Sequence, residues 1–467
     1  MSHEPGSHIV MEASAALRDS GISRDFDFGD ALRLPQGSRT ENPRILLTAT
    51  LRWPLAARLA IALRKLGCPV QAWCPVGHPL EKTRAVERIY RCGALAPQRS
   101  LRSAILAAAP DFIIPCDDDA AIHLHQLHEA SHAAGPSAAL RRLIERSLGT
   151  PASCSLATAR GELMRLARAE NMRVPETGRL SSLADLDQWC AQSGFPAVLK
   201  LDRSWGGLGV TVVRDMDQAR DALRAATHPS LMRALSHLIL RRDSSHLLRR
   251  FSGARPSITI QKYISGRPAN RAVACWQGEV LAGISVVALQ TQNPTGPATV
   301  VQVIENEEMS EAARRLVRAL GLSGLCGLDF VIDAHSGDAY LIEVNPRATP
   351  IGHLALAAGQ DLPAALHARL RGEPVPSSAY AIRGDIIAMF PGEWRRNLLS
   401  PYLRTAFHDV PWAEEELVRD CVDLPWEQRG IAARIRARLR PRPELSPHFA
   451  SFSHPGIRST RGAVPEK

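Results

Sequence analysis

The sequence contains very little lysine. Its 57 basic residues include 5 lysines, which leaves 52 arginines (57 − 5 = 52) to carry most of the net charge of +10. The arginines are scattered among acidic residues through most of the chain, a pattern typical of a solvated surface rather than of a nucleic-acid-binding face. A lysine inside a predicted strand is therefore an unusual choice in this protein, and Lys200 is one such residue.

The sequence also lacks the features of secreted and membrane proteins. No apolar run approaches the roughly 20 residues of a membrane-spanning helix, and no basic segment followed by an apolar one marks a signal peptide at the N-terminus. The 9 cysteines are odd in number and never spaced C-x-x-C, which argues against a disulfide framework and against a zinc site. We therefore expect a cytoplasmic protein with neither a membrane nor a nucleic acid as partner.

The N-terminal part predicts an α/β domain. Residues 1–42 show no sustained periodicity and are expected to form a mobile tail. Apolar runs at 44–48, 70–74 and 112–115 predict strands, and helical patterns at 55–66 and 99–109 lie between them. Strands that alternate with helices indicate a parallel sheet. Farther along, segments 257–263, 271–275 and 280–287 alternate like antiparallel strands.

Two polar groups follow the last of these N-terminal strands. Asp117, Asp118 and Asp119 come directly after it, where open α/β sheets bind ligands. The same acids also suit a helix N-terminus, and both interpretations stay open. His128 and His132 have the i, i+4 spacing of a metal pair, but a surface or buried neutral role is the default for such histidines.

Lys200 ends a predicted strand at 196–201 and precedes a glycine-rich loop, residues 204–209. Glycines let backbone N–H groups approach phosphate oxygens, and a lysine adds a positive charge against the same anion. The order of residues differs from a P-loop and from a dinucleotide fingerprint, because the lysine comes before the glycines and no helix opens on them. An ordinary tight turn is the alternative.

A second polar cluster lies on a predicted hairpin. Asp329 and Glu343 stand on strands 326–332 and 339–344, which are joined by a Ser-Gly-Asp turn. Asn345 shares the face of Glu343 because side chains alternate along a strand. These oxygen ligands suit Mg²⁺, and Arg347 is close enough in sequence to reach a transferred phosphoryl group. The alternative, exposed strand acids, is disfavoured because both carboxylates stand in apolar runs.

At this point the chain resembles the ATP-grasp enzymes. Four segments follow the order of that family's signatures: 195–200 with the glycine-rich loop, 260–266, 327–330 and 341–347. The resemblance covers residues 44–372. It implies an α/β and α+β fold with an N-terminal parallel-sheet domain at 43–150, a two-lobed ATP-grasp domain at 151–372 and a C-terminal extension at 373–467.

The resemblance also implies roles for individual residues. Asp329, Glu343 and Asn345 would hold Mg²⁺, or Mn²⁺ in its place, and Arg347 would be the catalytic residue that steadies the transferred phosphoryl group. The ATP-binding residues would be Arg160, Lys200, Ser204, Gly206, Gly207, Gly209, Gln261, Lys262, Tyr263 and Ile264. The backbone of Lys262 and Ile264 would read adenine. The chain departs from the pattern at Gln261, where an acid is frequent, at Asp329, where glutamate is usual, and after Gly266, where no carboxylate follows for the ribose.

Three hypotheses about function follow from the resemblance. In the first, ATP phosphorylates a small-molecule carboxylate and an amine attacks the acyl phosphate, releasing ADP and phosphate. The second is bicarbonate activation, as in carboxylases or carbamoyl phosphate synthesis. The third is a regulatory protein that binds ATP without turning it over. The acceptor pocket is expected near Asp117 to Asp119 and His353, and a homodimer is left open.

Overall fold

The structure is a computed structural model. It describes residues 41–93, 95–131, 137–149, 159–201, 209–227, 258–294, 296–378 and 381–422. The predicted tail at 1–42, apart from its last two residues, lies outside the described residues, as do Ser204, Gly206, Gly207 and His132. No helix in the described part of the chain is both long and apolar enough to cross a bilayer.

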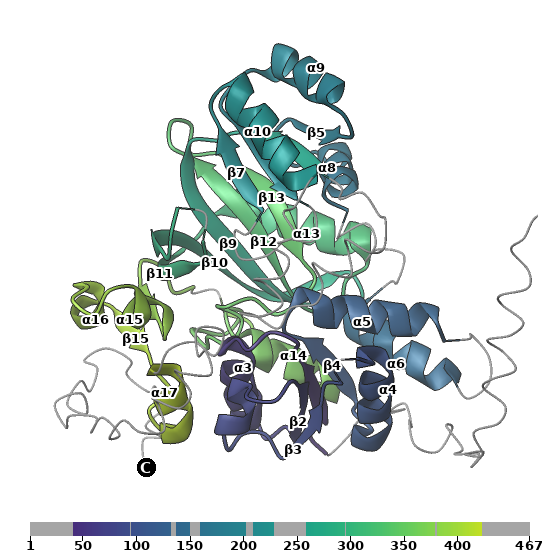
Figure 1. Cartoon of the computed structure of the whole chain (residues 1–467). Coiled ribbons are helices and arrows are strands. Elements are labelled where there is room, and N and C mark those ends of the chain that lie inside the picture. Colours follow the sequence, from purple (N-terminus) through teal and green to yellow (C-terminus); the bar gives the residue numbers. More distant parts are fainter. Residues whose placement is uncertain are drawn as a thin grey trace, which may run out of the picture.

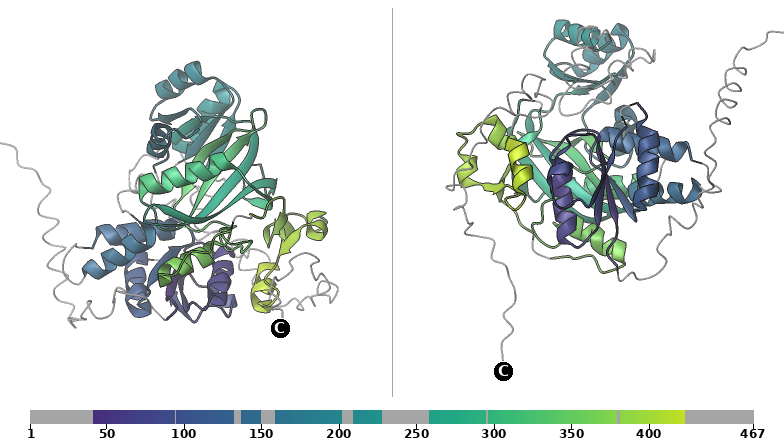
Figure 2. Two further views of the ribbon diagram at one scale, coloured as in Figure 1. Left: turned by 180° about the vertical axis from the view of Figure 1, so that it is seen from behind. Right: turned by 60° about the horizontal axis from the view of Figure 1, so that its bottom comes forward.

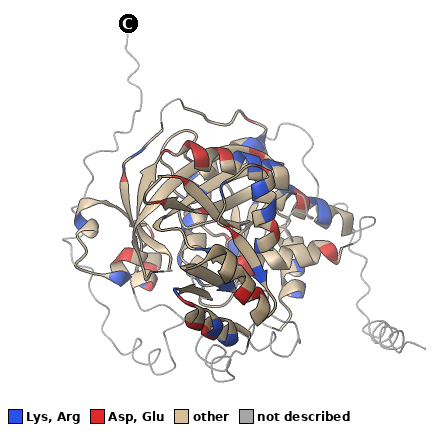
Figure 3. Ribbon diagram, turned by 90° about the horizontal axis from the view of Figure 1, so that it is seen from above, with Lys and Arg blue, Asp and Glu red and all other residues tan. Residues whose placement is uncertain are grey.

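The described elements form three sheets with helices packed against them. Figure 1 shows a small sheet at the top, a large sheet in the middle and a third sheet at the bottom, built from the N-terminal part of the chain. Figure 2 shows the same order from behind, with the C-terminal helices beside the lower sheet. Basic and acidic residues are interspersed over these elements in Figure 3, as the sequence predicts.

The lower sheet is parallel, with strand order β3-β2-β1-β4. Its strands are β1 (Ile45–Thr48), β2 (Val70–Cys74), β3 (Arg88–Arg91) and β4 (Phe112–Pro115). Its helices are α3 (Leu55–Lys65), η1 (Pro79–Lys82), α4 (Pro97–Ala108), α5 (Asp118–Glu129) and α6 (Ala138–Leu148). The predicted parallel α/β domain is confirmed. The sequence did not reveal β3, because this edge strand is short and has an exposed arginine at each end.

The small sheet is antiparallel, with order β5-β8-β6-β7. Its elements are β5 (Thr177–Leu180), α9 (Leu183–Ser193), β6 (Ala197–Leu201), β7 (Val210–Val213), α10 (Met216–Thr227) and β8 (Ile258–Lys262). Leu199, Ile258 and Ile260 point into a core with α9 and α10, so these helices cover one face of the sheet. The other face carries the intervening residues of β6 and β8.

The large sheet has the order β13-β12-β9-β10-β11-β14-β15. Its elements are β9 (Gly266–Trp276), β10 (Glu279–Thr291), β11 (Ala298–Ile304), α13 (Glu307–Leu320), β12 (Gly324–Asp333) and β13 (Ala339–Asn345). Helix α8 (Arg160–Ala169) and α13 pack on one face through a core that includes Leu163, Leu316, Leu328 and Phe330. Helix α13 begins directly after Asn306, whose side chain caps it by accepting from the Met309 N–H.

The C-terminal part extends the large sheet. Its elements are α14 (Leu362–Arg371), β14 (Ile386–Met389), α15 (Gly392–Arg396), α16 (Tyr402–Thr405), β15 (Phe407–Asp409) and α17 (Glu415–Val422). β14 pairs with β11 and β15 with β14. The segment leading into α17 and the helix itself reach the lower sheet's side through ion pairs of Lys82 with Glu416 and Arg84 with Glu414. This segment therefore bridges the large sheet and the N-terminal domain.

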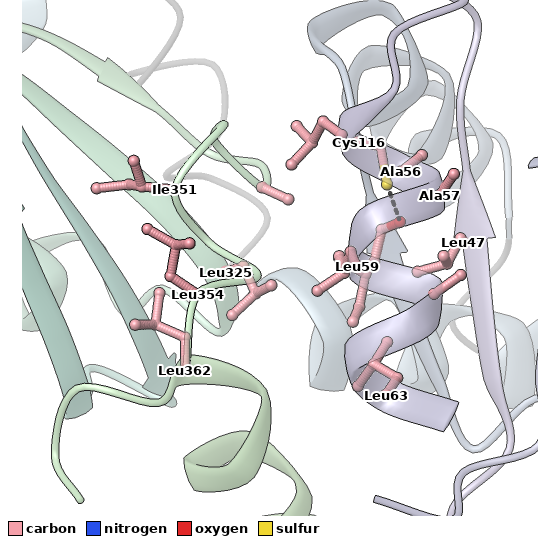
Figure 4. Packing of buried hydrophobic residues seen from close by; sticks show 14 of the residues in the cluster. Leu47, Ala56, Ala57, Leu59, Leu63, Cys116, Leu325, Ile351, Leu354 and Leu362 are labelled. Carbon is pink, nitrogen blue, oxygen red and sulfur yellow. Dashed lines mark hydrogen bonds between the residues drawn. The ribbon is translucent and has the colours of Figure 1, made fainter. Parts of the chain in front are cut away.

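One hydrophobic core joins the lower and large sheets. It contains Leu47 and Leu59 from the N-terminal domain and Leu325 and Leu354 from the other side. Figure 4 shows buried side chains of α3 and of residues 351–362 facing each other across this junction. The core fixes the N-terminal domain against the segment that follows β13.

Candidate active site

The predicted carboxylate pair forms on the hairpin of β12 and β13. Asp329 and Glu343 are directly opposite each other, and the register shifts after Asp329. Leu328 and Phe330 point into the core beneath α13, so Asp329 between them lies on the face that this helix does not cover. Side chains directly opposite in an antiparallel pair lie close together, which brings two negative charges to one point of the sheet.

Polar side chains surround both carboxylates. The amide of Asn270 on β9 donates to Asp329 Oδ1 (2.6 Å), and the amide of Asn345 donates to Asp329 Oδ2 (2.9 Å). Arg160, at the start of α8, donates to Glu343 Oε1 (2.7 Å) and is itself buried. Burial raises the pKa of Asp329, and the charge of Glu343 raises it further. Both effects disfavour a second negative charge beside Glu343, so a bound cation would stabilise the fully ionised pair.

These residues fit a hard divalent cation. Asp329, Glu343 and Asn345 supply oxygen atoms of the kind that Mg²⁺ and Mn²⁺ bind. Asn270 Oδ1 is buried beside them without a hydrogen-bond partner in the structure. Within the described residues, no group of three or more His, Cys, Asp and Glu side chains is arranged to hold a metal, so amide oxygens or substrate oxygens would complete the set. The sequence did not single out Asn270, although an asparagine in a strand of buried apolar residues was the available signal.

Arg347 is enclosed on several sides. Its side chain donates to Asp118 Oδ1 (2.8 Å), to the Ala348 carbonyl (3.2 Å) and to Asn345 Oδ1 (3.0 Å). The ring of Trp53 lies 5.7 Å from the guanidinium carbon. Burial by itself lowers the pKa of Arg347, but the carboxylates of Asp118, Asp329 and Asp117 together outweigh this effect, and the pKa is raised above its usual value. Arg347 is thus a permanent positive charge, linked through Asn345 to the carboxylate pair.

The second group of predicted residues lies on the small sheet. Lys200 and Gln261 alternate with residues that point toward α9 and α10, so both lie on the face without helices. Lys200 is buried, and the Gln261 amide donates to Thr177 Oγ1 (3.2 Å). Gly209 has a φ of +75° and its carbonyl accepts from the Leu201 N–H (2.9 Å), which closes the loop between β6 and β7 at its base. A side chain at Gly209 would strain this conformation.

The segment after β8 leaves the small sheet. The Lys262 N–H donates to the Glu176 carbonyl (2.9 Å) and the Tyr263 N–H to the Pro196 carbonyl (3.1 Å). The side chains of Lys262 and Tyr263 are exposed, and Ile264 is partly buried. The backbone N–H groups of Lys262 and Tyr263 are thus already used in hydrogen bonds. The N–H of Ile264 is the next backbone donor along the segment that leads to the large sheet.

Two histidines that the sequence raised have other partners. His128 is buried and bonds Glu145 on α6 (2.8 Å), which supports the structural interpretation of this residue. His353 is buried and its Nε2 lies 2.7 Å from Asp409 on β15. Arg58 on α3 forms an ion pair with the same carboxylate. This buried cluster of Arg58, His353 and Asp409 ties three parts of the chain together.

The fold and the site together define a class of protein. An N-terminal parallel sheet precedes an antiparallel lobe with a lysine before a glycine-rich loop. A larger, mainly antiparallel lobe follows, with a carboxylate pair beside a buried arginine. Residues 242–350 match the ATP-grasp domain family. This segment of the chain thus carries an ATP-grasp domain.

Relatives of the chain include a curated protein and several solved structures. The carbamoyl phosphate synthase large chain of Rubrobacter xylanophilus is 24% identical over 265 residues, which are 53% of this chain and 22% of that protein. The chain thus spans about a fifth of that relative's length.

Three solved structures share the fold at low sequence identity. An ADP complex of PurK, N5-carboxyaminoimidazole ribonucleotide synthetase, has a TM-score of 0.51 and 14% identity over 75% of this chain and 81% of that one. The Staphylococcus aureus N5-carboxyaminoimidazole synthetase has a TM-score of 0.51 and 13% identity over 75% of this chain and 83% of that one. The biotin carboxylase domain of Hydrogenobacter thermophilus 2-oxoglutarate carboxylase has a TM-score of 0.52 and 16% identity over 74% of each chain.

Proposed function

We propose that this protein is an ATP-dependent ligase that activates a small-molecule carboxylate as an acyl phosphate, which an amine then attacks with release of ADP and phosphate. The observation that carries the proposal is a polar cluster in which Asp329 and Glu343 are opposite each other on the hairpin. Arg160 donates to Glu343, and Asn345 links Asp329 to Arg347. Carboxylates, a fixed cation and an amide in one network suit phosphoryl transfer, where catalysis consists mainly of positioning and charge neutralisation.

The nucleotide would bind between the two lobes. Lys200 and the loop of Ser204, Gly206, Gly207 and Gly209 would hold the phosphates from the small sheet. Gln261 to Ile264 would receive adenine. Because the Lys262 N–H already donates to Glu176, its contribution would be the carbonyl oxygen, whereas Ile264 would contribute its N–H.

Asp329, Glu343 and Asn345 would hold Mg²⁺, which would neutralise phosphate charge at the site. Arg160 forms an ion pair with Glu343 in the structure. From this position its guanidinium would donate to a phosphate oxygen of the nucleotide. Arg347 would donate to the phosphoryl group as it moves to the acceptor. The acceptor carboxylate would lie near Arg347 and Asp118, at the carboxyl end of β4.

Bicarbonate is the second candidate acceptor. Among the similar structures, the carboxylase domain is a complex with MgADP and bicarbonate, and the curated relative is a carbamoyl phosphate synthase. Bicarbonate carries the same anionic CO₂⁻ group as a carboxylate, so the same network would activate it. ADP formation that depends on added bicarbonate, and on no organic acid, would favour this candidate.

A phosphate-release screen tests the proposal. Purified protein is incubated with ATP, Mg²⁺ and pairs drawn from organic acids and amines, with one bicarbonate arm. The expected result is phosphate release that requires both members of one pair. Phosphate release at the same rate with and without every acid, or no phosphate release with any pair, would contradict a ligase.

Replacing Lys200 tests the nucleotide site. Lys200→Ala removes the positive charge before the loop, and we expect the dissociation constant for MgADP to rise on the order of tenfold, the effect of one charge-assisted phosphate contact. Isothermal titration calorimetry measures it. Lys65→Ala, at the exposed end of α3, is the matched control and should bind normally. Equal affinity of both variants would place the nucleotide elsewhere.

Thermal melting tests the metal cluster. Because a cation offsets the negative charge of Asp329 and Glu343, we expect MgADP to raise the melting temperature more than ADP with chelator does. Glu343→Gln, which keeps the shape but removes one charge, should abolish most of that difference. Glu279→Gln, an exposed acid of β10 in the same lobe, is the control. A Mg²⁺ effect that survives Glu343→Gln would remove this residue from the metal site.

A further inference from the structure

Arg347 is held by parts of the N-terminal domain that are distant in sequence. Asp118, in the first turn of α5, accepts from Arg347 Nε (2.8 Å). Trp53, in the loop between β1 and α3, stacks against the guanidinium at 5.7 Å. Next to them the Ala348 N–H donates to the Pro115 carbonyl at the end of β4 (3.0 Å). The N-terminal domain thus contacts Arg347 or its neighbour at three points.

Asp117 joins the two elements that make these contacts. It is buried at 1% exposure and caps α5 by accepting from the Ala120 N–H (2.9 Å). The same carboxylate accepts from the Thr50 N–H (2.6 Å) and the Leu51 N–H (2.9 Å) of the loop that leads to Trp53. The start of α5 and this loop are therefore fixed relative to each other. Asp118 and Trp53 present one preformed surface to Arg347.

The hydrogen bonds of Arg347 also define what remains for a ligand. A guanidinium has five N–H groups. The Nε–H is used by Asp118, one N–H of the first terminal nitrogen by the Ala348 carbonyl and one of the second by Asn345. One N–H on each terminal nitrogen is left over for an anion. The direction of these two groups depends on the plane of the guanidinium, to which the N-terminal domain contributes the Asp118 hydrogen bond and the Trp53 ring.

We propose that Asp118, supported by Trp53, is a positioning residue for Arg347. By this inference the N-terminal domain aims the two remaining N–H groups at the transferred phosphoryl group, and catalysis requires contact between that domain and the ATP-grasp lobes. The inference rests on the proposed function for its effect on turnover, but its geometric content does not depend on it. Misplacing a catalytic group by about 1 Å lowers rates on the order of 100-fold.

The test is a set of substitutions on α5. Asp118→Ala should lower kcat for phosphate release on the order of 100-fold and leave the KM for ATP unchanged, because the nucleotide contacts are elsewhere. Acetate added to this variant should restore part of kcat by replacing the missing carboxylate. Asp118→Asn keeps an oxygen acceptor, so its kcat should lie between the values for Asp118→Ala and for wild type. Glu129→Gln, on the exposed last turn of α5, should behave as wild type.

Each outcome separates this inference from the proposed function. A fall in kcat together with a higher KM for ATP and no response to acetate would mean that Asp118 is merely structural, and would overturn the inference. If the wild type shows no turnover, the proposed function fails first. Crystal structures of wild type and Asp118→Ala then decide: a guanidinium that leaves its place between Trp53 and Asn345 supports the inference, and an unmoved one refutes it.

Discussion

Arg347→Ala is expected to lower the rate of phosphate release on the order of 1,000-fold while MgADP still binds with wild-type affinity. The reason is that Arg347 is a buried, permanently charged donor beside the carboxylate pair, and removing one preformed donor to a developing charge has an effect of this size. Single-turnover phosphate release and titration calorimetry measure the two quantities separately.

Two further variants make the Arg347 result specific. Arg347→Lys keeps the charge but loses the fork that Asp118, Ala348 and Asn345 hold, so most of the rate should still be lost. Arg314 lies on α13, where it forms ion pairs with Glu307 and Glu311 of the same helix. Arg314→Ala is therefore the control and should keep full activity. Unchanged turnover in Arg347→Ala would exclude the catalytic role, and would favour a protein that binds ATP without using this arginine.

Asp409→Asn is expected to destabilise the protein by about 3–5 kcal/mol, the usual cost of removing one partner from a buried ion pair. Arg58 and His353 both contact Asp409, and the side chains of Arg58 and Asp409 are 11% and 7% exposed. The variant leaves the Arg58 guanidinium in the interior without its carboxylate. Denaturant unfolding measures the loss, and Glu416→Gln is the control, because the exposed pair with Lys82 should contribute less than about 1 kcal/mol.

The same cluster predicts a dependence of stability on pH. Burial opposes ionisation of Asp409, but His353 and Arg58 outweigh it and lower the pKa to about 2. An acid whose pKa is depressed in the folded state stabilises it above the unfolded pKa and loses that contribution as pH falls through the folded value. The stability difference between wild type and Asp409→Asn should therefore be full at pH 6 and shrink below about pH 4. A difference that stays constant down to pH 3 would contradict this role.

Local pattern was sufficient to predict the main elements of the site. The hairpin of Asp329 and Glu343 could be predicted because strand alternation and the apolar neighbours of each acid determine which residues share a face. Lys200 stood out because lysine is rare in this chain. The parallel sheet followed from short apolar runs that alternate with helices, as β1, β2 and β4 show.

Contacts between distant residues could not be predicted. Arg58 and Asp409 are separated by 351 positions, and nothing in either neighbourhood indicates the other. β14 pairs with β11, whose sequence has no feature that identifies its partner. Asn270 supports Asp329 from the neighbouring strand β9, and that pairing depends on the register of the large sheet. Asp118 was noted for its place after β4, but its contact with Arg347 required the packed domains.

An acceptor carboxylate is expected to become an acyl phosphate at the network of Asp329, Glu343 and Arg347. Transfer of ¹⁸O tests this most directly, because an acyl phosphate that an amine attacks leaves one carboxylate oxygen on the phosphate. The protein is turned over with ATP, Mg²⁺, amines and a pool of ¹⁸O-labelled acids, including bicarbonate, and the phosphate is analysed by mass spectrometry. We expect one ¹⁸O per phosphate formed, and phosphate that is released without any ¹⁸O would contradict an acyl-phosphate intermediate.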